Sequence, residues 1–269
     1  MRIALSAAVV SFSLAVAACG QIEDEPQEAQ DSIRAAVEAP REVIDSLLEE
    51  SAPSLQSAEL SAEDVLDKHL EAIGGKEAYL AVEKLATKNT TRNRGAVIEA
   101  VYYRKPPDLL VHSFKIDGVP NTFNTFNGKV LIQERDRAVD TVRDGKIIEQ
   151  FAVAADIHLY TRLDEHGIKV KNMGVAELES FEAYKLHFVY PSGFHKYSYF
   201  DVETFLHVRD EFDKELQGDV YRHVVDFADF EEKNGVLYPR RITTRFAGRE
   251  SVAVVTDVLV NDEVSESIF

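Results

Sequence analysis

The chain of 269 residues has a single cysteine, few basic residues and little uninterrupted apolar sequence. With only Cys19, no intrachain disulfide is possible, so packing must hold the fold together. A net charge of −17 and the lack of any Lys or Arg cluster exclude binding to a nucleic-acid backbone, because that affinity comes from cations that displace counterions. The longest apolar run, Ile3 to Ala18, would extend only ~24 Å as a helix, short of the ~30 Å hydrocarbon core of a membrane.

The sequence also lacks the motifs of common enzyme and metal sites. No Gly-rich phosphate loop follows a strand-like segment, no G-x-S-x-G occurs, and the eight histidines do not have the spacing of a helical zinc site. Acidic residues are too numerous for one pair to stand out as a general acid and base. We therefore expect no enzymatic activity, no catalytic residue, no metal and no cofactor.

The N-terminus has the form of a secretory signal. Met1-Arg2 supplies a positive start, and the apolar run from Ile3 ends in the residues V-A-A-C, which resemble a bacterial lipobox. The resemblance implies that residues 1–18 are a lipoprotein signal peptide and that Cys19 is lipidated after cleavage. Gly20, rather than Asp, favours the outer membrane, with the protein anchored by its lipid on the periplasmic face. The alternative is a chance cysteine behind a plain secretory signal.

Residues 19–60 are expected to form the lipidated cysteine and an acidic flexible linker. Residues 20–60 hold 11 acidic and 2 basic side chains, and such a segment repels itself and buries too little apolar surface to order. Its coil dimension would be roughly 35 Å, enough to let a domain leave the membrane surface. Residues 40–48 have the apolar spacing of one short helix, which is either transient or docks on the domain.

Residues 61–269 are expected to fold as one domain that begins with helices and is otherwise mainly β. Ser61 and Asp64 form a capping box, an amphipathic helix follows as far as Ile73, and Gly74-Gly75 ends it. A second short helix is predicted over 76–82 and another within 144–160. Asn-Gly pairs at 127–128 and 234–235 predict hairpins, so consecutive strands should be antiparallel neighbours.

Apolar and polar residues alternate in several strand-like segments, which predicts a sheet with one buried face. The apolar positions are Ile98, Ala100, Tyr102, Leu110, Phe114, Ile116, Tyr184, Leu186, Phe188, Tyr190, Val252, Val254, Val258 and Val260. Three polar residues, His112, Arg222 and Arg240, share this parity. Each either orients a ligand head group or latches a helix, or else it occupies a rim, a bulge or a hydrogen-bonded core position.

Six segments together resemble the LolA/LolB-like family of periplasmic lipoprotein-sorting proteins. They are residues 64–85, 102–111, 126–132, 182–186, 197–206 and 227–242, and their order and spacing carry the resemblance. It implies an α+β, mainly β fold: an unclosed half-barrel of antiparallel strands, with helices plugging the concave face over a hydrophobic cavity. The helices near 64–73 and 146–157 are then lid candidates. Arg104 falls in the region where a family member uses an arginine to hold its lid, but the local match does not assign it that role.

The resemblance implies that the cavity takes acyl chains of lipids or lipoproteins. The expected ligand contacts are Ile98, Ala100, Tyr102, Leu110, Phe114, Ile116, Leu186, Phe188 and Val254. The expected function is carriage or acceptance of such chains across the periplasm by an outer-membrane lipoprotein. Its partners would be acyl chains, the membrane through the anchor and an unidentified periplasmic protein, but no nucleic acid. The alternative is a tethered sensor or protein-interaction domain on the same fold, without carrier activity.

Overall fold

The computed structural model describes residues 60–269, except residues 94, 136–137, 180 and 217. The signal peptide, Cys19 and nearly all of the acidic linker lie outside the described residues. The predictions made for them therefore stay predictions.

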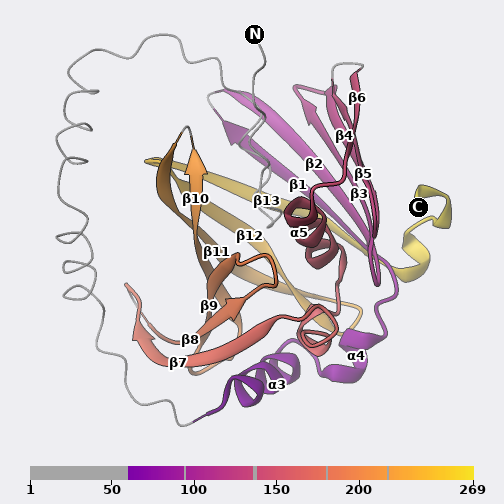
Figure 1. The fold of residues 1–269 in the computed structure, drawn as a ribbon. Coiled ribbons are helices and arrows are strands. Elements are labelled where there is room, and N and C mark those ends of the chain that lie inside the picture. The colour runs from indigo at the N-terminus through magenta and orange to yellow at the C-terminus, as the bar shows by residue number, and fades with distance from the viewer. Residues whose placement is uncertain (1–59, 94, 136–137, 180, 217) are drawn as a thin grey trace.

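The described strands form one antiparallel sheet in which sequence neighbours pair (Figure 1). The strands are β1 (Leu85–Asn93), β2 (Ala96–Lys105), β3 (Leu109–Ile116), β4 (Val119–Asn127), β5 (Leu131–Arg135), β6 (Ala138–Val142), β7 (Lys169–Glu177), β8 (Glu182–Val189), β9 (His195–Asp201), β10 (His207–Leu216), β11 (Asp219–Lys233), β12 (Val236–Phe246) and β13 (Arg249–Val260). Their order is β6-β5-β4-β3-β2-β1-β13-β12-β11-β10-β9-β8-β7. The sheet thus has two open edges, β6 and β7, and the predicted unclosed half-barrel is confirmed.

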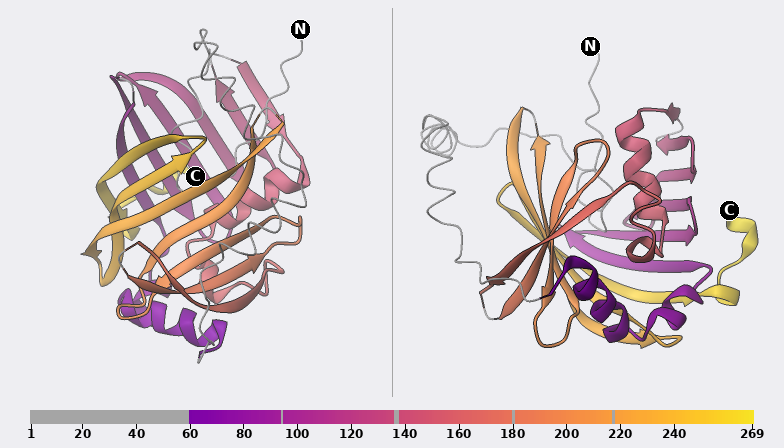
Figure 2. Two further views of the ribbon diagram at one scale, coloured as in Figure 1. Left: turned by 90° about the vertical axis from the view of Figure 1, so that its left-hand side faces the viewer. Right: turned by 60° about the horizontal axis from the view of Figure 1, so that its bottom comes forward.

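The chain crosses from one edge to the other through α5 (Gly145–Ala155) and the short helix η2 (Leu159–Thr161). The views in Figure 2 show the sheet bent into a trough, with α5 along the inner side of the half that contains β2 to β6. Phe151 and Ala155 of α5 pack there on Leu110, Phe126 and Leu131. The helix predicted within 144–160 is confirmed, and it covers part of the concave face.

Two helices at the start of the domain, α3 (Ala62–Ala72) and α4 (Lys76–Leu80), cover one end of the trough (Figure 1). The capping box is present: Asp64 N donates to Ser61 Oγ over 3.0 Å, and Ser61 N donates to the Asp64 carboxylate over 2.9 Å. Gly74, at φ +126°, follows α3, and a Cβ there would lie 1.8 Å from the carbonyl oxygen of Gly235. Only glycine therefore fits where this turn meets the β11–β12 hairpin.

The apolar side of α3 divides between two buried clusters. Val65 and Leu66 pack on Leu186, Phe188 and neighbouring residues beneath the helix. Farther along, Leu70 and Ile73 join a second cluster, which contains Phe212, Val225, Val236, Ile242 and Val258. The chain ends after β13 with two short 3-10 helices, η3 (Asn261–Glu263) and η4 (Glu266–Ile268).

The predicted alternation is wrong for part of β13. Val254 is 51% exposed and pairs with Arg241, whereas Val255, Val258 and Val260 are buried. The pairing of β1 with β13 shifts between Lys88 and Asn89, and this bulge adds one residue to β13. An extra residue reverses which side chains face the core, so Val252 and Val254 lie on the outer face.

Arg222 also lies on the outer face, against the predicted parity. Its neighbours His223 and Val225 are the buried residues of β11. The Arg222 side chain is 46% exposed and pairs with Asp213 over 2.7 Å. It is therefore unavailable to the concave face.

Candidate functional site

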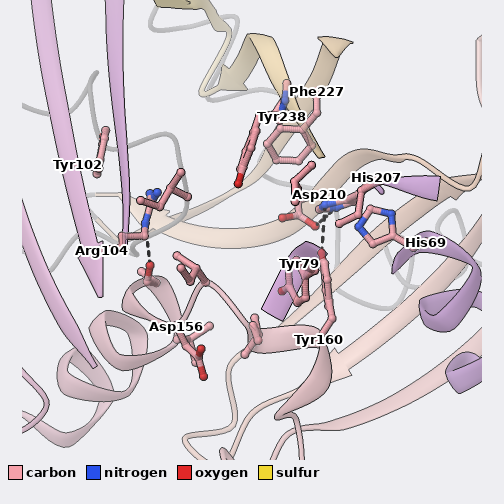
Figure 3. A pocket seen from close by; sticks show the side chains of 18 of the residues that line it. His69, Tyr79, Tyr102, Arg104, Asp156, Tyr160, His207, Asp210, Phe227 and Tyr238 are labelled. Atoms are coloured by element: carbon pink, nitrogen blue, oxygen red, sulfur yellow. Dashed lines mark hydrogen bonds and ion pairs between the residues drawn. The ribbon is translucent and has the colours of Figure 1, made fainter. Parts of the chain in front are cut away.

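A cavity of about 300 Å³ lies between the concave face of the sheet and the helices that cover it. Most of its wall is apolar or aromatic. The residues that line it are His69, Ile73, Tyr79, Val82, Leu85, Tyr102, Arg104, Gln150, Val153, Ala154, Asp156, Ile157, Leu159, Tyr160, Tyr190, Phe194, Lys196, His207, Asp210, Phe212, Phe227, Phe230, Val236, Leu237, Tyr238 and Pro239. Figure 3 shows Arg104 and Tyr102 on one side and His207, Asp210 and His69 across from them.

Helix α3 contributes a buried histidine to the wall. His69 is 4% exposed, and its Nδ1 lies 2.9 Å from the carbonyl oxygen of Phe205. The ring meets Tyr160 and Phe200 edge-on, with centroids 5.3 and 5.0 Å away. Burial lowers the pKa of His69 to about 3, and the neighbouring His207 contributes a smaller part of this shift. The ring is therefore neutral at pH 7 and serves as an aromatic contact that ties α3 to β9 and β10.

A buried ion pair lies on the same side of the wall as His69 (Figure 3). Lys196 of β9 donates to Asp210 of β10 over 2.9 Å, and their side chains are 13% and 5% exposed. His207 Nε2 lies 2.9 Å from the same carboxylate, and its Nδ1 lies 3.2 Å from the Tyr160 hydroxyl. Burial opposes ionisation of Asp210, but Lys196, His207 and Ser198 together hold its pKa below the ordinary aspartate value.

This network has its charges and hydrogen bonds satisfied internally. Burial likewise opposes the charge on Lys196, and Asp210 nevertheless raises the pKa of its ammonium above the ordinary value. The two charges neutralise each other, so the wall they form carries no excess charge toward a ligand. The network joins β9, β10 and η2 and serves as a structural support for the cavity.

Arg104 of β2 connects the sheet to α5. Its Nε donates to the carbonyl oxygen of Ala154 over 3.0 Å, and its guanidinium lies 5.3 Å from the centre of the Tyr102 ring. Burial lowers the pKa of Arg104 to about 10, which still leaves the group charged at pH 7. A cation at the C-terminal end of a helix is also favoured by the helix dipole. Arg104 therefore fastens the C-terminal end of α5 to β2.

A second ionic group fixes the turn after α5. Asp156, whose side chain is fully buried, accepts from Arg162 over 2.9 Å and lies 2.8 Å from His166. Glu149, on the other side of α5, accepts a hydrogen bond from the backbone of Ser192 over 2.9 Å. The helix is thus held to the rest of the domain at both its flank and its C-terminal end.

Of the expected ligand contacts, Tyr102 lines the cavity. Ile98, Ala100 and Phe114 pack with Tyr102 elsewhere on the concave face, and Ile116 is half-buried opposite Ile98 at the end of β3. Leu110 lies beneath α5, and Leu186 and Phe188 lie beneath α3. Val254 lies on the outer face, as described above. Eight of the nine residues therefore share the concave side, but only one of them contacts the cavity.

The sequence reasoning missed most of the wall because helices and loops supply much of it. Tyr79 and Tyr160 come from α4 and η2, where strand alternation says nothing, and Phe227 and Tyr238 come from β11 and β12. One signal was available for β8 and its end, since Tyr190 follows the alternation of Leu186 and Phe188 and does line the cavity.

The described residues include no group of three or more His, Cys, Asp or Glu side chains placed to hold a metal ion. Within that same part of the chain, no helix is both long enough and apolar enough to cross a membrane.

Solved structures with a similar fold are known for this architecture. No protein-family model matches the sequence, and no curated protein matches it either. Among solved structures, the chain is similar to a LolA superfamily protein from Nitrosomonas europaea, with a TM-score of 0.54 and 14% identity over 78% of this chain and 97% of that one. The fold is LolA-like. A DUF1329 family protein from Desulfovibrio piger is similar too, with a TM-score of 0.52 and 9% identity over 76% of this chain and 94% of the other.

The LolA-like fold explains the position of the cavity. Both similar structures are covered almost end to end, so the shared part is the whole half-barrel with its helices and not a single hairpin or helix. At these identities the likeness concerns the fold, which accounts for a concave sheet with α3, α4 and α5 over it. The residues in the cavity wall belong to this chain and carry the functional argument.

Proposed function

We propose that this protein is an outer-membrane lipoprotein that binds the acyl chain of a lipid or lipoprotein in the cavity of its half-barrel and carries or accepts it in the periplasm. The observation that supports the proposal is a largely apolar cavity of about 300 Å³ between the sheet and the covering helices. That volume is at the lower end of the ~300–1,000 Å³ typical of small-molecule sites.

Burial of hydrocarbon supplies the affinity in this proposal. Each CH₂ group removed from water contributes about 0.8 kcal/mol, so one long acyl chain is retained without any charged contact. The aromatic side chains Tyr160, Phe194 and Phe227 give the chain wide apolar surfaces to pack on. The charges of Lys196 and Asp210 neutralise each other, so their part of the wall presents no net charge to an apolar guest.

Entry of the chain requires one of the covering helices to move. Helix α5 is held by the Arg104 bond to Ala154 and by the Glu149 bond to Ser192. These are a few polar contacts and one apolar cluster, and α5 lies in the segment that connects the two edge strands, β6 and β7, along the sequence. It is therefore the lid in this proposal, with Arg104 as the residue that holds it closed.

The membrane anchor completes the proposal. Cys19 carries the lipid, residues 1–18 are removed, and the acidic linker up to residue 60 lets the domain of residues 61–269 leave the membrane surface. A Cys19→Ser chain is expected to lose labelling by a fatty-acid analogue. Labelling that persists in that variant would contradict the anchor.

The cavity is tested by native mass spectrometry with lipid extraction on the full chain carrying Cys19→Ser, purified from the periplasm. We expect a stoichiometric acyl ligand. Val153→Trp fills the cavity wall from α5 and should reduce ligand occupancy at least about tenfold, ~1.4 kcal/mol. Val254→Trp, on the outer face, is the matched control and should retain the ligand.

An empty domain that also refuses added lipids and lipopeptides would reject lipid binding. That outcome would favour the alternative function, a tethered sensor or protein-interaction domain. Circular dichroism of both variants ensures that lost occupancy reflects a filled cavity and not unfolding.

A further inference from the structure

A row of polar side chains crosses the concave face beside the cavity. Thr87 pairs with Tyr102, Tyr102 with His112, His112 with Asn124, and Asn124 with Gln133, on five consecutive strands. Directly paired residues of antiparallel strands project on the same side of the sheet. Because Tyr102 lines the cavity, the whole row lies on the concave face.

The neighbouring row has the opposite character. Leu85, Arg104, Leu110, Phe126 and Leu131 are paired in the same way, and α5 packs on the apolar members of this row. The polar row thus borders a mainly apolar row on the side that α5 covers. On its other side lies the row of Asn89, Ala100, Phe114 and Thr122, two of whose members are apolar.

Several polar atoms in or next to the polar row are buried and have no hydrogen-bond partner among the described residues. They are Thr87 Oγ1, Asn89 Oδ1, His112 Nε2 and, on α5, Gln150 Oε1. Thr87, Asn89 and His112 are 3%, 4% and 2% exposed. Gln150 lines the cavity itself. Buried polar atoms are almost always hydrogen-bonded in native proteins, so this cluster beside the cavity offers donors and acceptors to a ligand that has polar groups of its own.

These unsatisfied groups are uncharged. Thr87, Asn89 and Gln150 carry no charge at any relevant pH, and burial, followed by the nearby Arg104, lowers the pKa of His112 to about 3. The imidazole stacks on Tyr102 with centroids 4.0 Å apart, which fixes its edge toward the row. Neutral amides, a hydroxyl and a neutral imidazole hydrogen-bond hydroxyl and amide groups without requiring a counter-ion.

We propose that the concave face beside Tyr102 is a head-group subsite for an uncharged amphiphile, whose hydroxyl or amide groups hydrogen-bond to Thr87, Asn89 and His112 while its acyl chain occupies the cavity. The inference rests on the proposed acyl-chain binding and specifies the class of ligand. In this proposal the polar row distinguishes lipids by their head groups, and the apolar cavity wall holds the acyl chain.

Three probes with the same acyl chain test the subsite: 1-monooleoylglycerol, methyl oleate and oleate. Each is titrated against the full chain carrying Cys19→Ser, and displacement of a fluorescent acyl probe from the cavity is measured. Monooleoylglycerol should bind at least about tenfold more tightly than methyl oleate, ~1.4 kcal/mol, because only its head group donates hydrogen bonds.

The variants localise this preference. His112→Phe and Asn89→Leu should remove most of the difference between the two neutral probes while leaving the affinity for methyl oleate nearly unchanged. Ser113→Ala, next to His112 but on the outer side of β3, should keep the wild-type preference. Thr87→Val removes the hydroxyl with almost no change in side-chain shape. If the larger replacements unfold the chain, this variant tests whether the preference for monooleoylglycerol over methyl oleate is lost.

Equal binding of monooleoylglycerol and methyl oleate by the wild-type chain would overturn the subsite and leave acyl-chain binding intact. Tighter binding of oleate than of monooleoylglycerol would also overturn it, since a charge on Arg104 would then direct the head group. If none of the three probes binds, both the subsite and the proposed function are rejected.

Discussion

Arg104 on β2 and Ala154 on α5 are joined by one hydrogen bond of 3.0 Å, from the guanidinium Nε to the backbone oxygen. The two residues are fifty positions apart in the sequence, and the bond closes the helix onto the inner face of the sheet. Since β2 lies inside the sheet, four strands away from the edge strand β6, this contact holds α5 over the inner face and not at an open edge.

Replacing Arg104 should loosen α5 selectively. Arg104→Met keeps most of the buried stem but removes a charged hydrogen bond, which contributes about 1.5–3 kcal/mol. Hydrogen exchange is followed by mass spectrometry in the variant and in the wild-type chain. The substitution should speed up exchange in residues 145–155 and leave exchange in α3 nearly unchanged. Arg241→Met removes only an exposed ion pair with Asp229 and is the control. Unchanged exchange in α5 would show that Arg104 does not hold the helix.

Breaking the Lys196–Asp210 pair should destabilise the whole domain. Lys196→Met leaves a buried carboxylate without its ammonium, and losing one member of such a pair costs about 3–5 kcal/mol. Adding Asp210→Asn removes the stranded charge, so the double variant should lose less than the sum of the two single variants. Urea unfolding measures all three. Lys88→Met, which breaks the exposed pair with Asp257, should change stability by less than about 1 kcal/mol.

The free energy of unfolding should begin to fall as the pH drops below about 6.5, where histidine in the unfolded chain takes up a proton. Burial lowers the pKa of His69 to about 3, below its unfolded value, so the unfolded chain binds more protons between about pH 6.5 and pH 3. Stability is then complete above pH 6.5 and falls as the pH drops. At pH 4.5 this histidine alone should cost about 2 kcal/mol relative to pH 7.

The variant His69→Gln isolates that contribution. Its free energy of unfolding, measured in urea at pH 7 and pH 4.5, should fall less between the two conditions than that of the wild-type chain. Part of the remaining fall comes from His112 and His223, whose pKa values burial also lowers, to about 3 and about 4. Carboxylates whose pKa ion pairs lower, such as Glu179 beside Arg209, add to it. An identical fall in wild type and variant would contradict a neutral, buried His69.

The turn between α3 and α4 should tolerate no side chain at its first glycine. Gly74→Ala would place a Cβ 1.8 Å from the backbone oxygen of Gly235, at a positive φ, so the expected loss exceeds about 2 kcal/mol. Gly75 also has a positive φ, but nothing lies within 4 Å of its Cβ position. Gly75→Ala should therefore cost only about 1 kcal/mol, and thermal unfolding of the two variants gives the comparison.

Local signals in the sequence were enough to predict the helices and the hairpins. The Ser61–Asp64 capping box, the glycines after Ile73 and the Asn-Gly turns act over a few residues, and the structure has all of them where they were expected. A capping hydrogen bond or a positive φ depends on the residues that make it, so it can be recognised without the rest of the chain. The one-sided sheet was equally visible in most strands, but the predicted parity was wrong around Arg222 and in part of β13.

The cavity wall was not predictable in this way. Val254 follows the apolar alternation of β13, but the extra residue near Thr256 turns it to the outer face, and that bulge is set by how β1 pairs with β13. Tyr79 and Tyr160 reach the cavity because α4 and η2 fold across the end of the sheet. Such placements depend on contacts between segments far apart in sequence, which no local pattern encodes.

The amino-acid sequence by itself determined the α+β composition, the antiparallel pairing of consecutive strands and the helix within 144–160, since each arises from local periodicity and turn chemistry. The pairing of β1 with β13 is a long-range contact that only the tertiary structure decided. Only the tertiary structure decided which side chains meet at the cavity. It also brought Thr87, Asn89 and His112 together, because their burial on one face depends on the register of three paired strands and on the curvature of the whole sheet.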